Sequence, residues 1–274
     1  MELSNDIAFA RQAVVDAAQL LKPFIASATR RSDSTRQKAA GEVVTEADQL
    51  LNDFLIRCIS DKYPNDAICA EEGSAHDNAD ASRRWIIDPI DGTRSFIRGV
   101  PGFSVLLALA VEGEPVLGVV HDPLDGTTWF AARGKGVHRQ TSDGISPVVA
   151  AVKPPKLIWS PYADATRGDA LREALGLRSL DPVESFGLRA VELALDGAGV
   201  FASRPGSPHL WDTASAYVIV KEAGGVITGY DGNPLVYWQN ESTLHPRGAV
   251  ASLGLEHASV LELIETYLPA TPTP

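Results

Sequence analysis

The sequence predicts a mixed fold in which an α+β half is followed by an α/β half. In the first half, two helical patterns precede a run of consecutive strand patterns, whereas strands and helices alternate in the second half. The chain has 274 residues, of which 45% are hydrophobic and 22% are charged, so it has ample material for a buried core. This length suits one large domain or two closely packed lobes.

The first half contains the two predicted helices. Apolar residues at helical spacing predict a helix over residues 4–25, with Ser4 as its N-cap, and a second helix from Thr45 onward with Leu50 and Leu51 on its buried face. The polar segment between them, residues 27–43, is expected to form a mobile surface loop. Strand patterns separated by Gly, Pro and Asp then follow at residues 67–70, 84–88, 103–111, 115–120 and 127–133.

The two halves are joined through residues 140–156, whose Ser, Pro and Lys content is typical of a linker between lobes. We therefore expect an N-terminal α+β lobe over residues 1–145 and a C-terminal α/β lobe over residues 146–274. The predicted strands of the second lobe are residues 156–160, 199–203, 225–230 and 248–252. Its predicted helices are residues 168–176, 187–197, 211–224 and 255–268.

Charge and hydropathy limit the possible partners. The net charge of −11 argues against a nucleic-acid polymer, because an acidic surface repels the phosphodiester backbone. No apolar run approaches the ~20 residues that span a bilayer, and the N-terminus has no signal-peptide pattern, so no membrane partner is expected. The two cysteines, Cys58 and Cys69, lie in apolar segments, which favours buried free thiols in the cytoplasm over a disulfide.

Two six-residue stretches are nearly identical, "DPIDGT" at 88–93 and "DPLDGT" at 122–127. The second lies between two strand patterns, and its Pro and Asp-Gly are typical of a hairpin turn. The first follows a buried strand pattern and precedes a possible helical turn, where ligands and anions often bind. Its aspartates are hard oxygen donors of the kind that Mg²⁺ prefers, although an ordinary strand-to-helix turn remains an equal alternative on these residues alone.

Other acids stand at the ends of predicted elements. Glu71 and Glu72 follow a strand, Asp48 is close to a capping box with Thr45, and Asp212 falls in the first turn of a helix. Each acid has an ordinary structural explanation, since acids favour the first turns of helices. Because no matching cluster of lysines accompanies them, the set favours a bound cation.

Four blocks of the sequence resemble the inositol monophosphatase superfamily of magnesium-dependent, lithium-sensitive phosphatases. The blocks are "VVTEADQLLNDFL", "AEEG", "WIIDPIDGTRSFIRGVPGFSV" and "WDTASAYVIVKEAGG", and they occur in the family's order over almost the whole chain. The resemblance implies a layered αβαβα sandwich of the inositol monophosphatase and fructose-1,6-bisphosphatase type. It also implies a small phosphorylated metabolite as substrate and a homodimer.

The resemblance implies a metal site for two or three Mg²⁺ ions, with Mn²⁺ as a possible substitute. The residues that match the family's metal ligands are Glu71, Asp88, the carbonyl of Ile90, Asp91 and Asp212. Glu71 and Thr93 would orient the attacking water, and Asp48 matches an acid behind the ligands. A metal-activated water would then attack phosphorus in line, without a covalent intermediate.

The implied substrate contacts are Gly92 and Thr93 on the phosphate, with Lys38, Asp212 and Arg204 nearby. Arg204 and Pro205 stand where inositol phosphatases carry an acid, so Arg204 could meet a second phosphate instead. Near the C-terminus, "GYDGNPLVY" followed by "STLHPRGAVAS" resembles the C-terminal block of 3′(2′),5′-bisphosphate nucleotidases. In contrast, "DGTRSF" is similar to histidinol-phosphate phosphatases. The substrate is therefore expected to be an inositol phosphate or 3′-phosphoadenosine 5′-phosphate, and a histidinol-phosphate phosphatase or a non-catalytic relative remains the alternative. The histidines His121, His209 and His245 are expected to be packing or surface residues.

Overall fold

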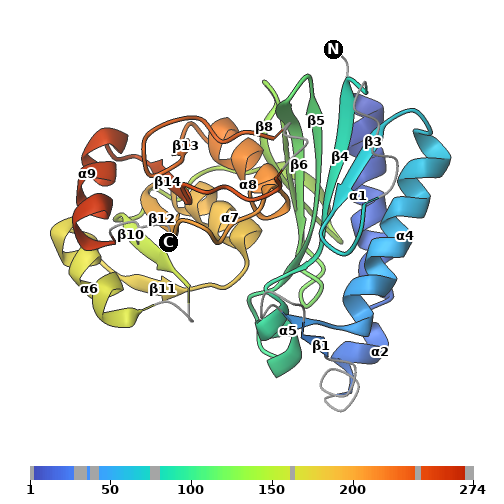
Figure 1. The fold of residues 1–274 in the computed structure, drawn as a ribbon, viewed down its shortest axis with the longest axis horizontal. Helices are drawn as coiled ribbons and strands as arrows, with labels where there is room; N and C mark the ends of the chain where they lie inside the picture. The colour runs from blue at the N-terminus through green and yellow to red at the C-terminus, as the bar shows by residue number, and fades with distance from the viewer. Residues whose placement is uncertain are drawn as a thin grey trace.

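The computed structural model describes residues 3–27, 36–37, 43–74, 81–160, 164–237 and 242–268. Within these ranges the chain forms two large β-sheets, with helices between and outside them, and a separate pair of two-residue strands (Figure 1). None of the helices in the described ranges is long and apolar enough to cross a membrane.

The N-terminal helical pattern forms two helices instead of the predicted one. These are α1, Ser4–Gln19, and α2, Lys22–Ile25. The break has a physical cause, because Pro23 lacks an N–H and its ring would collide with the carbonyl of Gln19. The predicted N-cap was also wrong, since Leu3 occupies that position and Ser4 is the first helical residue.

The next helix, α4, spans Glu46–Lys62 and starts as predicted, with Thr45 as its N-cap. On its buried face, Leu51, Leu55 and Ile59 recur at a spacing of four, whereas Leu50 is 42% exposed and does not belong to that face. Most of the predicted loop over residues 27–43 lies outside the described residues. Its described parts, β1 at Arg36–Gln37 and β2 at Val43–Val44, pair antiparallel.

The first sheet has seven strands in the order β3-β4-β5-β6-β7-β8-β9. Their bounds are β3 Ala67–Ala70, β4 Arg83–Asp91, β5 Ser104–Val111, β6 Glu114–His121, β7 Thr128–Ala132, β8 Gly136–Thr141 and β9 Gly144–Pro147. Only β3 and β4 pair in parallel, and the other neighbours are antiparallel. The sequence did not predict β8 and β9, because β9 is exposed at every position and β8 is largely polar, so neither carries an apolar pattern.

The second sheet has five strands in the order β11-β10-β12-β14-β13. Their bounds are β10 Lys156–Trp159, β11 Leu180–Pro182, β12 Gly199–Ser203, β13 Val226–Thr228 and β14 Ala249–Leu253. The short β11 was not predicted. The chain passes from the first sheet to the second between Pro147 and Lys156, and the predicted lobe boundary after residue 145 falls inside β9.

The remaining helices are α5 Thr93–Arg98, α6 Ala165–Ala174, α7 Phe186–Asp196, α8 Leu210–Glu222 and α9 His257–Tyr267. Figure 1 shows α1 and α4 on one face of the first sheet, α7 and α8 between the two sheets, and α6 and α9 on the far side. The layers therefore follow the order αβαβα, which confirms the predicted fold.

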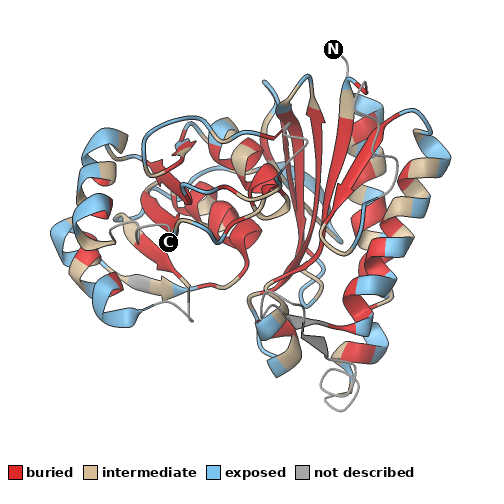
Figure 2. Cartoon of the chain, viewed as in Figure 1, coloured by how far each residue is buried: buried red, intermediate tan, exposed pale blue. Residues whose placement is uncertain are grey.

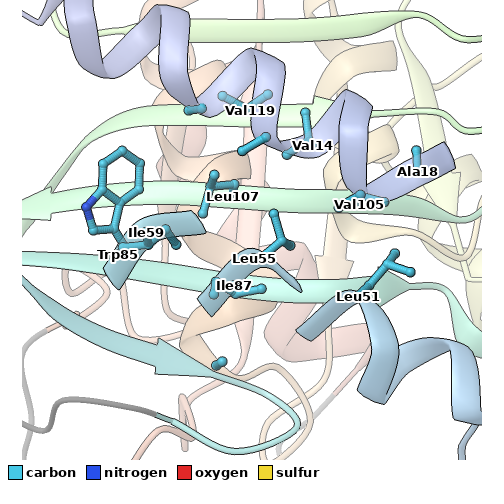
Figure 3. Packing of buried hydrophobic residues seen from close by; sticks show 14 of the residues in the cluster. Val14, Ala18, Leu51, Leu55, Ile59, Trp85, Ile87, Val105, Leu107 and Val119 are labelled. Atoms are coloured by element: carbon cyan, nitrogen blue, oxygen red, sulfur yellow. The ribbon is translucent and has the colours of Figure 1, made fainter. Parts of the chain in front are cut away.

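Hydrophobic clusters cover both faces of the first sheet. On the outer face, Leu51, Leu55 and Ile59 of α4 and Val14 of α1 pack over strand residues such as Trp85 (Figure 3). Each such side chain contributes about 1.5–3 kcal/mol when fully buried. Figure 2 shows that both sheets and the helices between them are largely buried, so the two lobes share a core.

Helix α8 crosses the inner face of the first sheet at close range. A Cβ atom on Gly118 of β6 would lie 2.6 Å from the carbonyl oxygen of Ser215 in α8, so only glycine permits this contact. Because α8 begins at Leu210, this contact brings its first turn, with Asp212, toward the end of β4.

Candidate active site

The first DPxDGT stretch forms the end of β4 and the turn into α5. Strand β4 continues past Asp88 to Asp91 with a shift of register between them, a β-bulge, so Asp88 does not end the strand as the sequence suggested. Gly92 follows with a φ of 95°. A Cβ atom at this position would lie only 2.6 Å from the carbonyl oxygen of Gly102, so the turn requires glycine.

Three aspartates from two layers of the fold meet at this turn. Carboxylate oxygens of Asp88, Asp91 and Asp212 lie within 4.8 Å of one another. Asp88 is 2% exposed, and its Oδ1 has no hydrogen-bond partner among the described residues. Burial, followed by the negative charges of Glu71, Asp91, Asp212 and Asp48, raises the pKa of Asp88 well above its usual value.

These residues fit a divalent cation. Hard carboxylate oxygens are the ligands that Mg²⁺ prefers, and a buried carboxylate oxygen without a donor is stabilised either by protonation or by a bound cation. The cluster could therefore hold a metal ion. The carbonyl of Ile90, another predicted ligand, accepts a 3.0 Å hydrogen bond from the hydroxyl of Thr93.

Two further predicted acids lie beside the cluster. Glu71 follows β3, and its N–H donates to the carbonyl of Ile87 in β4 at 3.2 Å. Asp48 is buried at the start of α4, where its Oδ2 accepts hydrogen bonds from Thr45 N at 2.8 Å and Thr45 Oγ1 at 2.5 Å. Burial raises the pKa of Asp48 to about 7, and its Oδ1 has no donor in the described part of the chain.

Asp91 also links the metal cluster to the second lobe. Its Oδ2 accepts from Ser185 Oγ at 2.7 Å and Gly187 N at 2.8 Å, and its Oδ1 accepts from Phe186 N at 3.0 Å. These donors form the N-terminal end of α7, where a negative charge is favoured. The sequence did not reveal this contact, although Ser185 before the apolar pattern of α7 carries an N-cap signal.

Asp212 is held by its own helix end. Its Oδ2 accepts the N–H of His209 at 2.6 Å, three residues earlier, in a capping-box arrangement at the start of α8. The rings of His209 and Trp211 stack with centroids 4.6 Å apart. His209 lines the cleft and packs on Trp211, and it is not part of the aspartate cluster. His121 and His245 are buried and bonded to threonines.

A cleft of about 260 Å³ opens over these acids. The predicted residues that line it are Glu71, Asp91, Gly92, Thr93 and Asp212. The lining also includes residues that the sequence did not single out as site residues, namely Arg94, Glu184, Phe186, Arg189, Ser203, Ser207, Pro208, His209 and Trp211. The cleft therefore has walls from both halves of the chain.

Two predicted substrate residues are not seen in this cleft. Arg204 is exposed and does not line it, although its neighbour Ser203 does, so the geometry gives no support to a substrate contact by Arg204. Lys38 lies outside the described residues.

The second DPxDGT stretch is a hairpin turn between β6 and β7, as predicted. Asp122 N donates to the carbonyl of Thr127 at 2.9 Å, and Asp125 Oδ1 accepts the N–H of Thr127 at 2.7 Å. The carboxylates of this stretch therefore serve the turn itself, and neither belongs to the metal cluster.

Comparison with known proteins agrees with this arrangement. The model of the inositol monophosphatase family matches residues 2–268. The chain belongs to this family. A histidinol-phosphatase of Mycobacterium tuberculosis is 33% identical over 226 residues, which cover 80% of this chain and 83% of the relative. A 3′(2′),5′-bisphosphate nucleotidase CysQ of Aggregatibacter actinomycetemcomitans is 31% identical over 255 residues, covering 86% and 90%.

A solved family structure, an IMPase of Thermotoga maritima, has a TM-score of 0.79 at 26% identity and covers 96% of this chain and 98% of that one. The predicted family and fold are therefore confirmed. The predicted enzyme class, phosphoric monoester hydrolase, is confirmed as well, because the chain belongs to this family and the two relatives described above are a phosphatase and a nucleotidase.

Proposed function

We propose that this chain is a Mg²⁺-dependent phosphatase that hydrolyses a small phosphate monoester in the cleft between α5, α7 and α8. The observation that carries the proposal is the meeting of Asp88, Asp91 and Asp212, with Asp88 buried and one of its oxygens without a donor among the described residues. Two or three divalent ions held there would offset the charge of the phosphate dianion and lower the pKa of the attacking water.

The chain's own residues would position the reactants. Glu71, Asp88, Asp91, Asp212 and the carbonyl of Ile90 would hold the ions. The backbone N–H groups of Gly92 and Thr93 would donate to the phosphate, because they stand at a turn into a helix. Glu71 and the hydroxyl of Thr93 would orient the attacking water, and Asp48 would support these groups from behind through its contact with Thr45.

The cleft is small, which suits a metabolite more than a polymer. The stacked pair of His209 and Trp211 in its wall supports a leaving group with a flat ring, since such rings stack on aromatic side chains. This favours 3′-phosphoadenosine 5′-phosphate over inositol phosphate. A homodimer and a cytoplasmic location remain predictions from the sequence.

Histidinol phosphate is the second candidate. Two histidinol-phosphatases, from Mycobacterium tuberculosis and Chlorobaculum parvum, are 33% and 37% identical to this chain. The imidazole ring of that substrate could also stack on the aromatic pair. The acidic Glu184 in the cleft wall could meet its ammonium group.

The test is phosphate release from inositol 1-phosphate, 3′-phosphoadenosine 5′-phosphate, histidinol phosphate and fructose 1,6-bisphosphate, with Mg²⁺, with EDTA and with added lithium. We expect release to require Mg²⁺ and to fall with lithium. Asp88→Asn and Asp212→Asn should each lower kcat by about 10²-fold or more, whereas Asp143→Asn in the exposed β8–β9 turn should change little. Full activity in either site variant, or activity in EDTA, contradicts the proposal.

A further inference from the structure

Arg189 places a fixed positive charge in the wall of the cleft. The residue lies in the first turn of α7, lines the cleft, and is only 5% exposed. It does not belong to the metal cluster. A buried guanidinium stays charged at every working pH, so it must be matched by negative charge.

The guanidinium is held in place by the chain around it. Its Nε donates to the carbonyl of Val183 at 2.8 Å, and one N–H of Nη2 donates to the carbonyl of Glu184 at 2.7 Å. It also lies over the ring of Phe186, 5.8 Å from the ring centre. The remaining N–H groups have no acceptor among the described residues, so a preformed donor set is left for a ligand.

The charge balance of the site indicates what kind of ligand this is. The negative groups that act on Arg189 are Asp91, Glu184 and Asp212. Two of these are proposed metal ligands, whose charge divalent ions would offset. Glu184 is partly committed elsewhere, because its Oε2 accepts the N–H of Ser95 at 2.6 Å. This bond leaves Glu184 negative, but Glu184 also interacts with the guanidinium of Arg94. With metal bound, Arg189 and Arg94 therefore share the one carboxylate of this set whose charge the ions would not offset.

We propose that Arg189 binds a second oxyanion, a phosphate or a carboxylate, on the alcohol part of the substrate. This inference rests on the proposed phosphatase function and gives Arg189 the role that the sequence suggested for Arg204. Arg204 is exposed outside the cleft, whereas Arg189 is fixed within it. A guanidinium suits this role because it donates to two oxygens of one anion.

The test uses two substrates that differ only in the second anion, adenosine 3′,5′-bisphosphate and adenosine 3′-phosphate. In Mg²⁺, the wild-type chain should prefer the bisphosphate, and added KCl should reduce that preference by screening. Arg189→Met should lower kcat/KM for the bisphosphate by about 10- to 100-fold and change that for the monophosphate less than about threefold. Arg204→Met is the matched control and should change neither value.

Three results would overturn the inference: no wild-type preference for the bisphosphate, equal loss on both substrates in Arg189→Met, or a stronger preference for the cationic histidinol phosphate. If Arg189→Met does not fold, Arg189→Lys takes its place. This variant keeps a cation and should retain part of the preference for the bisphosphate, so complete loss of that preference contradicts the inference. If no monoester releases phosphate, the proposed function fails separately. The affinities of the wild-type chain for adenosine 3′,5′-bisphosphate and adenosine 3′-phosphate, measured by calorimetry, then test the role of Arg189. Equal affinities overturn the inference.

Discussion

Gly92 and Gly126 occupy the same place in the two DPxDGT stretches, and changing each to alanine separates an active-site turn from a hairpin turn. Both residues have a positive φ, 95° and 75°. Alanine in this left-handed region costs about 1–2 kcal/mol at either position. At Gly126 the described part of the chain places no heavy atom beyond the neighbouring residues within 4 Å of the added Cβ, so this backbone cost should be the whole effect.

At Gly92 the added Cβ would also lie 2.6 Å from the carbonyl oxygen of Gly102. That carbonyl accepts the N–H of Ser185 at 3.0 Å, and the hydroxyl of Ser185 donates to Asp91. Moving Gly102 therefore disturbs a buried hydrogen bond worth about 1–3 kcal/mol and shifts Asp91, a proposed metal ligand. We expect Gly92→Ala to lose about 2–5 kcal/mol of unfolding free energy in total.

Activity should fall as well, because a displacement of about 1 Å at the reacting groups can cost 10²-fold in rate. The assay is urea unfolding together with kcat/KM in saturating Mg²⁺. Gly126→Ala should keep wild-type activity. The reasoning is refuted if the two variants lose equal stability, or if Gly92→Ala keeps activity within threefold of the wild type.

Further predictions concern the hairpin, a buried ion network and the metal-free site. Asp122→Ala and Asp125→Ala should leave kcat/KM within about threefold of wild type, because a turn can lose about 1 kcal/mol without moving the cleft. A hundredfold loss of kcat/KM in either variant would show that the hairpin belongs to the active site. Asp66→Ala should lower the free energy of unfolding in urea by about 2–4 kcal/mol. The carboxylate of Asp66 accepts hydrogen bonds from Arg83 at 3.0 Å and from the buried ring N–H of Trp85 at 2.9 Å. A loss below about 0.5 kcal/mol would mean that these bonds do not stabilise the fold. In EDTA at pH 7, Asp88→Asn should melt at a higher temperature than wild type. Burial and neighbouring acids raise the pKa of Asp88 in the fold, so its ionised form destabilises the metal-free protein as pH rises above the ordinary aspartate value; an unchanged or lower melting temperature contradicts this.

Several acids near the cleft could be predicted from the sequence because they end or begin a regular element. Glu71 follows β3 and Asp212 lies in the first turn of α8, as predicted, whereas β4 runs past Asp88, its predicted last residue, to Asp91. These positions follow from local hydrophobic patterns and capping signals, which depend on few neighbours in the chain. Hard acids at such ends imply a cation even before the fold is known.

Arg189 and Arg204 show where this reasoning stops. Arg189 falls within a largely apolar helical pattern that also contains Glu192 and Asp196, and nothing in that pattern indicates that Arg189 borders the cleft. Its burial depends on packing of α7 against the first sheet, which is fixed by contacts distant in sequence such as Ser185 to Asp91. Arg204 was favoured by its place before the "WD" pair, but local sequence does not reveal which way a loop side chain faces.

The elements that the sequence missed have physical reasons of the same kind. Strand β9 pairs at an exposed sheet edge, so its residues need not be apolar. The break between α1 and α2 was readable from Pro23, which should have ended the predicted helix before residue 25. Propensity and periodicity therefore identified the buried elements. Edge strands form by pairing with a neighbouring strand, and their own residue pattern does not reveal this pairing.

The central claim is that Asp88, Asp91 and Asp212 form a divalent-metal site. Its most direct test is calorimetric titration of metal-free protein with Mg²⁺. We predict that the wild-type chain binds at least two ions and that Asp88→Asn weakens or abolishes binding of at least one of them, by about 10-fold or more. Binding that is unchanged in Asp88→Asn, or a wild-type chain that binds no Mg²⁺, would contradict the claim.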